Sequence, residues 1–294
     1  MHRLNCTVPG AARLECLRGL PAAQLLQASI DTNAFMHSPI GTAYGPVMDG
    51  TFINRQHFES LELGLFRKVP LLITNMRDEG MFFVGSEIVS ALMTPYEFIH
   101  RTVPFMNQSE FSELHSLYKE DSSGLRNHND SDVLSDYYFK CPSRAIATAY
   151  AKEGLPVIKS FFSHVIGASY IPLLNMIFKS DLGASHGTDL PFWWQFQSIM
   201  IPFGQERALS RVMLRGLMDF GSCPDLRNCR ISGIEGSRVW PLYEQGRINL
   251  KTPVNQIFYE ADTEIDQRCE FFGRVITEKY QSGPFPGQEP PLKH

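Results

Sequence analysis

The chain has 294 residues, of which 43% are hydrophobic and 20% are charged, and these proportions exclude a disordered or fibrous protein. The net charge of −4, with Lys and Arg scattered along the sequence, excludes an electrostatic preference for nucleic acid or for an anionic membrane surface. No segment approaches the run of about 18 uncharged apolar residues that a membrane span requires.

The first predicted elements are a helix, a buried strand and a second helix. Residues 19–28 fit a helix with a proline in its first turn. Residues 69–74 form a continuous apolar run, which is typical of a strand buried on both faces of a sheet. Thr94 begins a capping box, in which Pro95 takes the first helical position and Glu97 reaches back to the helix start.

The second half of the chain continues this alternation. Residues 144–152 favour a helix that ends before Gly154, and residues 156–162 favour the strand that follows it. Residues 206–220 place their apolar side chains on one face of a helix, and a last helix begins near Thr263. Helices that alternate with strands predict an α/β fold with a mostly parallel central sheet and flanking helices.

Two polar side chains are the candidates for chemistry. Glu79 follows the strand at 69–74, and functional groups of open α/β sheets gather beyond the carboxyl ends of the strands. His186 lies in a later turn that is bounded by glycines. An acid that precedes its histidine is the order of α/β-hydrolases, in which the serine nucleophile comes first. No credible nucleophile precedes Glu79 in this sequence.

Ser185 is a formal alternative, because Gly183 to Gly187 satisfy the G-x-S-x-G pattern of a nucleophile elbow. An elbow needs a strand before the serine and a helix directly after it, and neither flank supports these elements. A serine next to its own base in the sequence is also badly placed to aim its hydroxyl at that imidazole. A self-contained small hydrolase that uses Ser185 therefore stays as a separate hypothesis.

The sequence predicts no metal and no cofactor. It contains no zinc-protease motif, no paired Cys-x-x-Cys motif and no glycine pattern for phosphates or dinucleotides. Cys223 and Cys229 have no histidine nearby and make a poor zinc site, and a local disulfide between them is an open alternative.

Three glycosylation sequons, at Asn5, Asn107 and Asn129, and an even total of six cysteines indicate a secretory protein. The first residues nevertheless contain no apolar segment of a signal peptide. Together these features lead us to expect that the sequence lacks the front of a longer, extracellular protein.

Seven short blocks occur in an order that is typical of one family. They are Glu15-Cys16-Leu17-Arg18, Met48-Asp49-Gly50-Thr51-Phe52-Ile53, Val69-Pro70-Leu71-Leu72, Asp78-Glu79-Gly80, Ser135-Asp136-Tyr137-Tyr138-Phe139-Lys140-Cys141-Pro142, Gly183 to Phe192, and Trp240-Pro241-Leu242-Tyr243. With these blocks the chain resembles the C-terminal half of type-B carboxylesterases and lipases, the cholinesterase-like branch of the α/β-hydrolases.

The resemblance implies that residues 1–280 are the C-terminal half of an α/β-hydrolase domain with an incomplete sheet. Residues 281–294 contain three glycine and proline clusters, which predict a flexible tail. The resemblance implies Glu79, rather than Asp78, as the acid and His186 as the base of a Ser–Glu–His triad. The serine and the oxyanion donors would lie upstream, so the isolated polypeptide is expected to be inactive. A small-molecule or lipid ester would be the substrate of the full-length protein only.

The resemblance also implies two disulfides, Cys6 with Cys16 and Cys141 with Cys269. The alternative is a set of reduced thiols in a cytosolic protein. The aromatic pair Trp193-Trp194 after the histidine either narrows an acyl pocket or simply belongs to the core, and we favour the core.

The leading hypothesis is therefore a carboxylic ester hydrolase. The competing hypothesis is a non-catalytic binding or adhesion protein on the same scaffold, because family members that lost catalysis commonly lack triad residues. The presence of both Glu79 and His186 favours the hydrolase.

Overall fold

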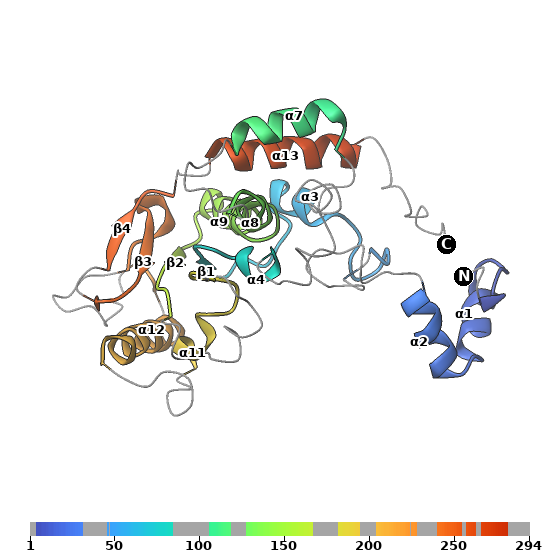
Figure 1. Cartoon of the computed structure of the whole chain (residues 1–294), viewed down its shortest axis with the longest axis horizontal. Coiled ribbons are helices and arrows are strands. Elements are labelled where there is room, and N and C mark those ends of the chain that lie inside the picture. Colours follow the sequence, from blue (N-terminus) through green and yellow to red (C-terminus); the bar gives the residue numbers. More distant parts are fainter. Residues whose placement is uncertain are drawn as a thin grey trace.

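The computed structural model of the chain describes residues 4–31, 46, 48–84, 106–118, 128–166, 182–194, 204–223, 225–227, 240–254, 257–262 and 266–281. Within these residues a four-stranded sheet lies at the centre of the fold (Figure 1). Across the sheet the strands are β1 (Leu71–Met76), β2 (Val157–Phe162), β3 (Arg247–Leu250) and β4 (Phe258–Glu260).

The first three strands are parallel, and β4 pairs antiparallel with β3. The predicted strands at 69–74 and 156–162 are confirmed as β1 and β2. β1 begins and ends slightly later in the sequence than predicted. The α/β class is confirmed as well. Pattern analysis missed β3 and β4, which span only 4 and 3 residues and therefore show no clear alternation.

One face of the sheet is covered by α11 (Leu190–Trp193) and α12 (Gly204–Ser222). Ile158 and Phe162 of β2 belong to the same buried cluster as Leu209 and Met213 of α12. The predicted helix at 206–220 is confirmed as α12. Because side chains alternate along a strand, Lys159 and Phe161 point to the opposite face.

The opposite face contacts α9 (Cys141–Lys152), which packs on β1 and β2. The predicted helix at 144–152 is confirmed, although it begins earlier because two other helical segments run directly into it. These segments are α8 (His128–Ser135) and a π-helical turn, η3 (Asp136–Lys140). The shorter elements around them are α3 (His57–Glu62), α4 (Met81–Val84) and the 3₁₀ turn η5 (Tyr243–Gln245).

A second core lies between α7 (Gln108–Leu117) and α13 (Asp266–Gln281), which lie side by side (Figure 1). A disulfide between Cys141 and Cys269 joins the start of α9 to α13. The last predicted helix is confirmed as α13. It extends to Gln281, and the remaining residues of the predicted tail, like the helix expected at Thr94, lie outside the described residues.

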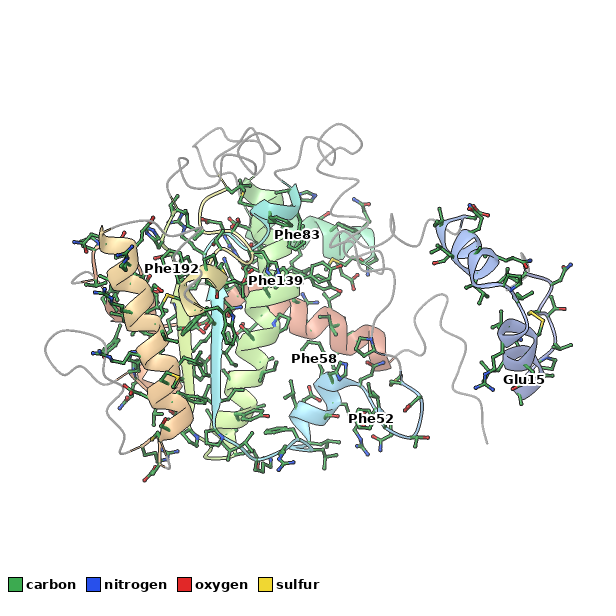
Figure 2. All side chains as sticks on the ribbon, turned by 90° about the horizontal axis from the view of Figure 1, so that it is seen from below. Glu15, Phe52, Phe58, Phe83, Phe139 and Phe192 are labelled. Atoms are coloured by element: carbon green, nitrogen blue, oxygen red, sulfur yellow. A yellow bond between two sulfur atoms is a disulfide. The ribbon has the colours of Figure 1, made fainter. Side chains whose placement is uncertain are left out.

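The N-terminal helices α1 (Ala11–Arg18) and α2 (Ala22–Asp31) lie apart from the sheet in both views (Figures 1 and 2). The helix predicted at 19–28 corresponds to α2, and a disulfide between Cys6 and Cys16 closes the segment around α1. None of the helices within the described residues combines the length and the apolar character that crossing a bilayer would take.

Candidate active site

The turn after β1 holds Glu79 in a buried position. The Glu79 residue is 2% exposed, and its Oε1 atom accepts a hydrogen bond of 2.9 Å from the backbone N–H of Met76, the last residue of β1. Gly80, the next residue, donates its backbone N–H to Oγ of Ser135 at 2.8 Å. A side chain at this position would overlap the backbone of Ser131, because its Cβ atom would lie too close. Close backbone contact with α8 therefore fixes the turn that carries Glu79.

The second oxygen of Glu79 faces His186. Its Oε2 atom lies 2.7 Å from Nδ1 of His186, whose side chain is 44% exposed. Within the described part of the chain, Nε2 of His186 has no hydrogen-bond partner. When Nδ1 carries a proton towards the carboxylate, Nε2 is left as a proton acceptor on the open edge of the ring.

Asp78 joins the two turns but does not contact the imidazole nitrogens. Its backbone N–H donates to the carbonyl of Ala184 at 3.0 Å, and its Oδ2 atom accepts the Ala184 N–H at 2.7 Å. Gly183 has a φ of 60°, and a side chain there would overlap the Asp78 carboxylate. Asp78 therefore fastens the histidine turn to the end of β1, while Glu79 meets the ring. The sequence signal for this role is the aspartate directly before Glu79.

A second buried acid, Asp189, lies near the pair and was not expected from the sequence. Asp189 is 6% exposed, and its Oδ2 atom accepts a hydrogen bond of 2.9 Å from the indole N–H of Trp193. Burial raises the pKa of Asp189. The hydrogen bond to Glu79 raises the pKa of His186 above its usual range; burial of the ring opposes this, and the charges of Glu79 and Asp189 add to it.

The raised pKa of His186 predicts a pH-dependent contribution to stability. Because the native pKa lies above the unfolded value of about 6.5, the contribution is complete below that pH and disappears as the pH rises through the native pKa. The measurement is the free energy of unfolding in urea, for the parent chain and for His186→Gln, at about pH 5 and about pH 9. The parent is expected to lose more stability between the two conditions than the variant, and equal losses would contradict the prediction.

Ser185 is enclosed beside this pair. It is 1% exposed, its backbone forms a β-bridge with Asp78, and its hydroxyl has no hydrogen-bond partner within the described residues. A nucleophile must reach both its base and a substrate, and a buried hydroxyl without a bond to the imidazole satisfies neither condition. The structure thus offers no support for the hypothesis that Ser185 attacks the substrate.

The aromatic pair after the histidine divides between core and surface. Trp193 is 7% exposed and belongs to the core cluster beside α12, whereas Trp194 is 63% exposed. Trp193 is thus a core residue, as we favoured. Among the residues that the structure describes, no group of three or more His, Cys, Asp or Glu side chains could hold a metal ion.

The other residues singled out from the sequence are the asparagines of the three sequons and two cysteines. Asn5 and Asn107 are exposed, and Oδ1 of Asn107 caps α7 by accepting the backbone N–H of Glu110 at 3.0 Å. Asn129 lies in α8. Glycosylation of all three asparagines stays a prediction. Cys223 is disulfide-bonded, and Cys229 lies outside the described residues.

A mostly parallel sheet with a buried acid in the turn after one strand, and a later histidine in a turn bridged to it, is the arrangement of the α/β-hydrolase class. Comparison with known proteins agrees with this class, because a model of the "Carboxylesterase family" matches residues 2–271. The chain belongs to the carboxylesterase family.

Similar proteins include Secreted lipase 4 of Gibberella zeae, 24% identical over 270 residues, which are 87% of this chain and 44% of the lipase. Acetylcholinesterase of Myxine glutinosa is 28% identical over 163 residues, 51% of this chain and 48% of that protein. The cAMP-regulated D2 protein of Dictyostelium discoideum is 24% identical over 194 residues, 64% of this chain and 35% of that protein. The matches thus cover less than half of each relative.

Proposed function

We propose that the protein hydrolyses carboxylic esters and that this chain contributes the acid, Glu79, and the general base, His186, of a Ser–Glu–His triad. The serine and the oxyanion donors would come from a segment outside these residues. The observation that carries the proposal is the 2.7 Å approach of Glu79 Oε2 to His186 Nδ1, which leaves Nε2 of a half-exposed side chain as the proton acceptor. Membership in the carboxylesterase family supports ester substrates in general.

In this mechanism Nε2 of His186 takes the proton of the serine hydroxyl as its oxygen attacks the ester carbonyl. The imidazolium then returns that proton to the departing alcohol, and an acyl-enzyme remains. Water, deprotonated by the same nitrogen, releases the acid and restores the serine. Glu79 keeps Nδ1 protonated and stabilises the positive ring during both steps.

The test compares two forms of the protein with a short-chain aryl ester. We expect the 294-residue chain alone to give no turnover and no labelling by a fluorophosphonate probe, and a form that also carries the serine-bearing segment to give both. Labelling of the chain alone at Ser185 would contradict the proposal. Absence of turnover in the longer form would favour the competing hypothesis, a non-catalytic binding or adhesion protein.

We propose an extracellular location for the whole protein. Disulfides that join Cys6 to Cys16 and Cys141 to Cys269 support it, because such bonds persist in oxidising compartments. The name of the similar Secreted lipase 4 supports it as well. A shift in mass on enzymatic removal of N-glycans from the native protein is the expected result, and an unmodified mass with free thiols would contradict it.

A further inference from the structure

Two phenylalanine rings lie beside the imidazole of His186. The centroid of the Phe139 ring lies 4.7 Å from that of His186 with the planes tilted by 39°, and the Phe83 ring lies 5.4 Å away with a tilt of 41°. The two phenylalanine rings are stacked on each other, with centroids 5.9 Å apart and 14° between their planes. Figure 2 labels both near the same end of the strands. The imidazole of His186 is thus held by two phenyl rings as well as by the carboxylate of Glu79.

Phe139 reaches this position from the π-helical turn η3. Turns of this kind are rare, occur mostly as single insertions in α-helices and are frequent at functional sites. Its first residue, Asp136, is completely buried and accepts a hydrogen bond of 2.7 Å from the hydroxyl of Tyr118. Arg268 of α13 lies 3.4 Å from the same carboxylate, and Lys140, the last residue of the turn, lies 3.7 Å from it. The buried Asp136 carboxylate therefore anchors the turn to Tyr118, the residue after α7, and to α13.

The other anchor of the turn is the end of β1. Asn75 donates its side-chain N–H to the backbone carbonyl of Phe139 at 3.5 Å, and its Oδ1 atom accepts the hydroxyl of Ser143 at 2.5 Å. Asn75 is 5% exposed. β1 leads into the turn that carries Glu79, and through Asn75 it also holds the backbone of Phe139. The same strand therefore positions both the acid and the phenyl ring.

The face of a phenyl ring carries negative charge density and attracts a nearby cation, most strongly where water is excluded. Such a contact stabilises a neutral imidazole only slightly, and it stabilises the positively charged imidazolium more. We propose that Phe139 is a positioning residue of the site: its ring aligns the imidazole of His186 with Glu79 and favours the imidazolium that acyl transfer produces. This inference rests on the proposed function of the pair.

Two charged groups act on His186 in the described part of the chain, Glu79 from the turn after β1 and Asp189 from the start of α11. Both raise its pKa, so the effect of the phenyl ring must be measured with both acids unchanged. Phe139→Leu meets this condition, because leucine keeps an uncharged apolar side chain beside the imidazole and has no aromatic face.

The experiment is an NMR titration of the His186 ring in the 294-residue chain, with its signal assigned by its loss in His186→Gln. We expect the pKa of His186 to fall by about 0.5 to 1 in Phe139→Leu, as a cation–ring contact of ordinary strength implies. Phe139→Tyr retains an aromatic face and is expected to keep the parent value. Phe66→Leu is the matched control, since Phe66 stacks on Tyr150 at 4.3 Å and is not among the rings that contact His186.

An unchanged or higher pKa in Phe139→Leu would overturn the inference. If that variant does not fold, Phe139→Met serves in its place with the same expectation and the same contrary result. Glu79→Gln separates this inference from the proposed function. A lower pKa in Glu79→Gln with no change in Phe139→Leu removes the role of Phe139 alone, whereas no change in Glu79→Gln contradicts the pairing on which the proposed function depends.

Discussion

Replacement of His186 by glutamine is expected to lower ester hydrolysis by about 10²–10⁴-fold in a form of the protein that carries the serine-bearing segment. Glutamine keeps polar atoms near Glu79 but cannot accept and return the proton that Nε2 carries. Because the loss concerns proton transfer in the transition state, kcat should fall while KM changes little. Steady-state kinetics with a short-chain aryl ester measure both constants.

The matched control for this prediction is His164→Gln. His164 is also paired with a carboxylate, since its Nε2 atom lies 2.9 Å from Oε1 of Glu206, and its Nδ1 atom lies 3.0 Å from the hydroxyl of Thr252. This second pair joins α12 to the segment that follows β2 and is not part of the candidate site. Activity should survive in His164→Gln if the protein remains folded. Equal losses in both variants would show that a damaged fold, rather than a lost base, explains the effect of His186→Gln.

The largest effect on stability is expected from Asp262→Ala. The Asp262 carboxylate pairs with the Lys159 ammonium, and its other oxygen accepts a hydrogen bond of 2.9 Å from Arg247. The Lys159 and Asp262 side chains are 2% and 4% exposed. Loss of the carboxylate leaves a buried cation without its partner, and removal of one member of a buried pair costs about 3–5 kcal/mol. Urea unfolding of the parent and the variant measures the difference.

Burial already lowers the pKa of Lys159, while the charge of Asp262 raises it. Without Asp262 the lysine is therefore expected to lose its proton at a lower pH, so part of the lost stability should return as the pH rises. The control is Glu153→Ala, which removes a pair with Lys68 at 2.9 Å whose side chains are 43% and 40% exposed. An exposed pair of this kind contributes less than about 1 kcal/mol. Similar losses in the two variants would refute the special role of the buried pair.

Much of the fold was predictable because local patterns and the tertiary structure agree. The apolar runs at β1 and β2 predict buried strands, and α12 carries an amphipathic stripe from Leu209 onward that matches its buried face. The glycine after α9 likewise marks its end, since Gly154 adopts a φ of 70°. These are local relations within one element, which a single sequence can display.

The charged residues of the sheet were not predictable in this way. Lys159 interrupts an apolar strand, and a pattern cannot tell whether such a residue faces water or a buried partner. Its partner, Asp262, lies 103 residues later in the chain. The π-helical turn was not predictable from the sequence either, because the groups that hold it lie elsewhere in the chain, in β1, at Tyr118 after α7 and in α13.

The sequence by itself determined the class of the fold, and its resemblance to type-B carboxylesterases singled out Glu79 and His186 as the two candidate groups, because the short blocks that carry them stand in the family's order. Only the tertiary structure decided that their atoms meet, that Asp78 fastens one turn to the other and that Phe139 lies against the imidazole. The physical reason is that hydrogen bonds and ring contacts act over a few ångströms in space. Two of these contacts join groups more than a hundred residues apart in the chain, which the packing of the sheet brings together.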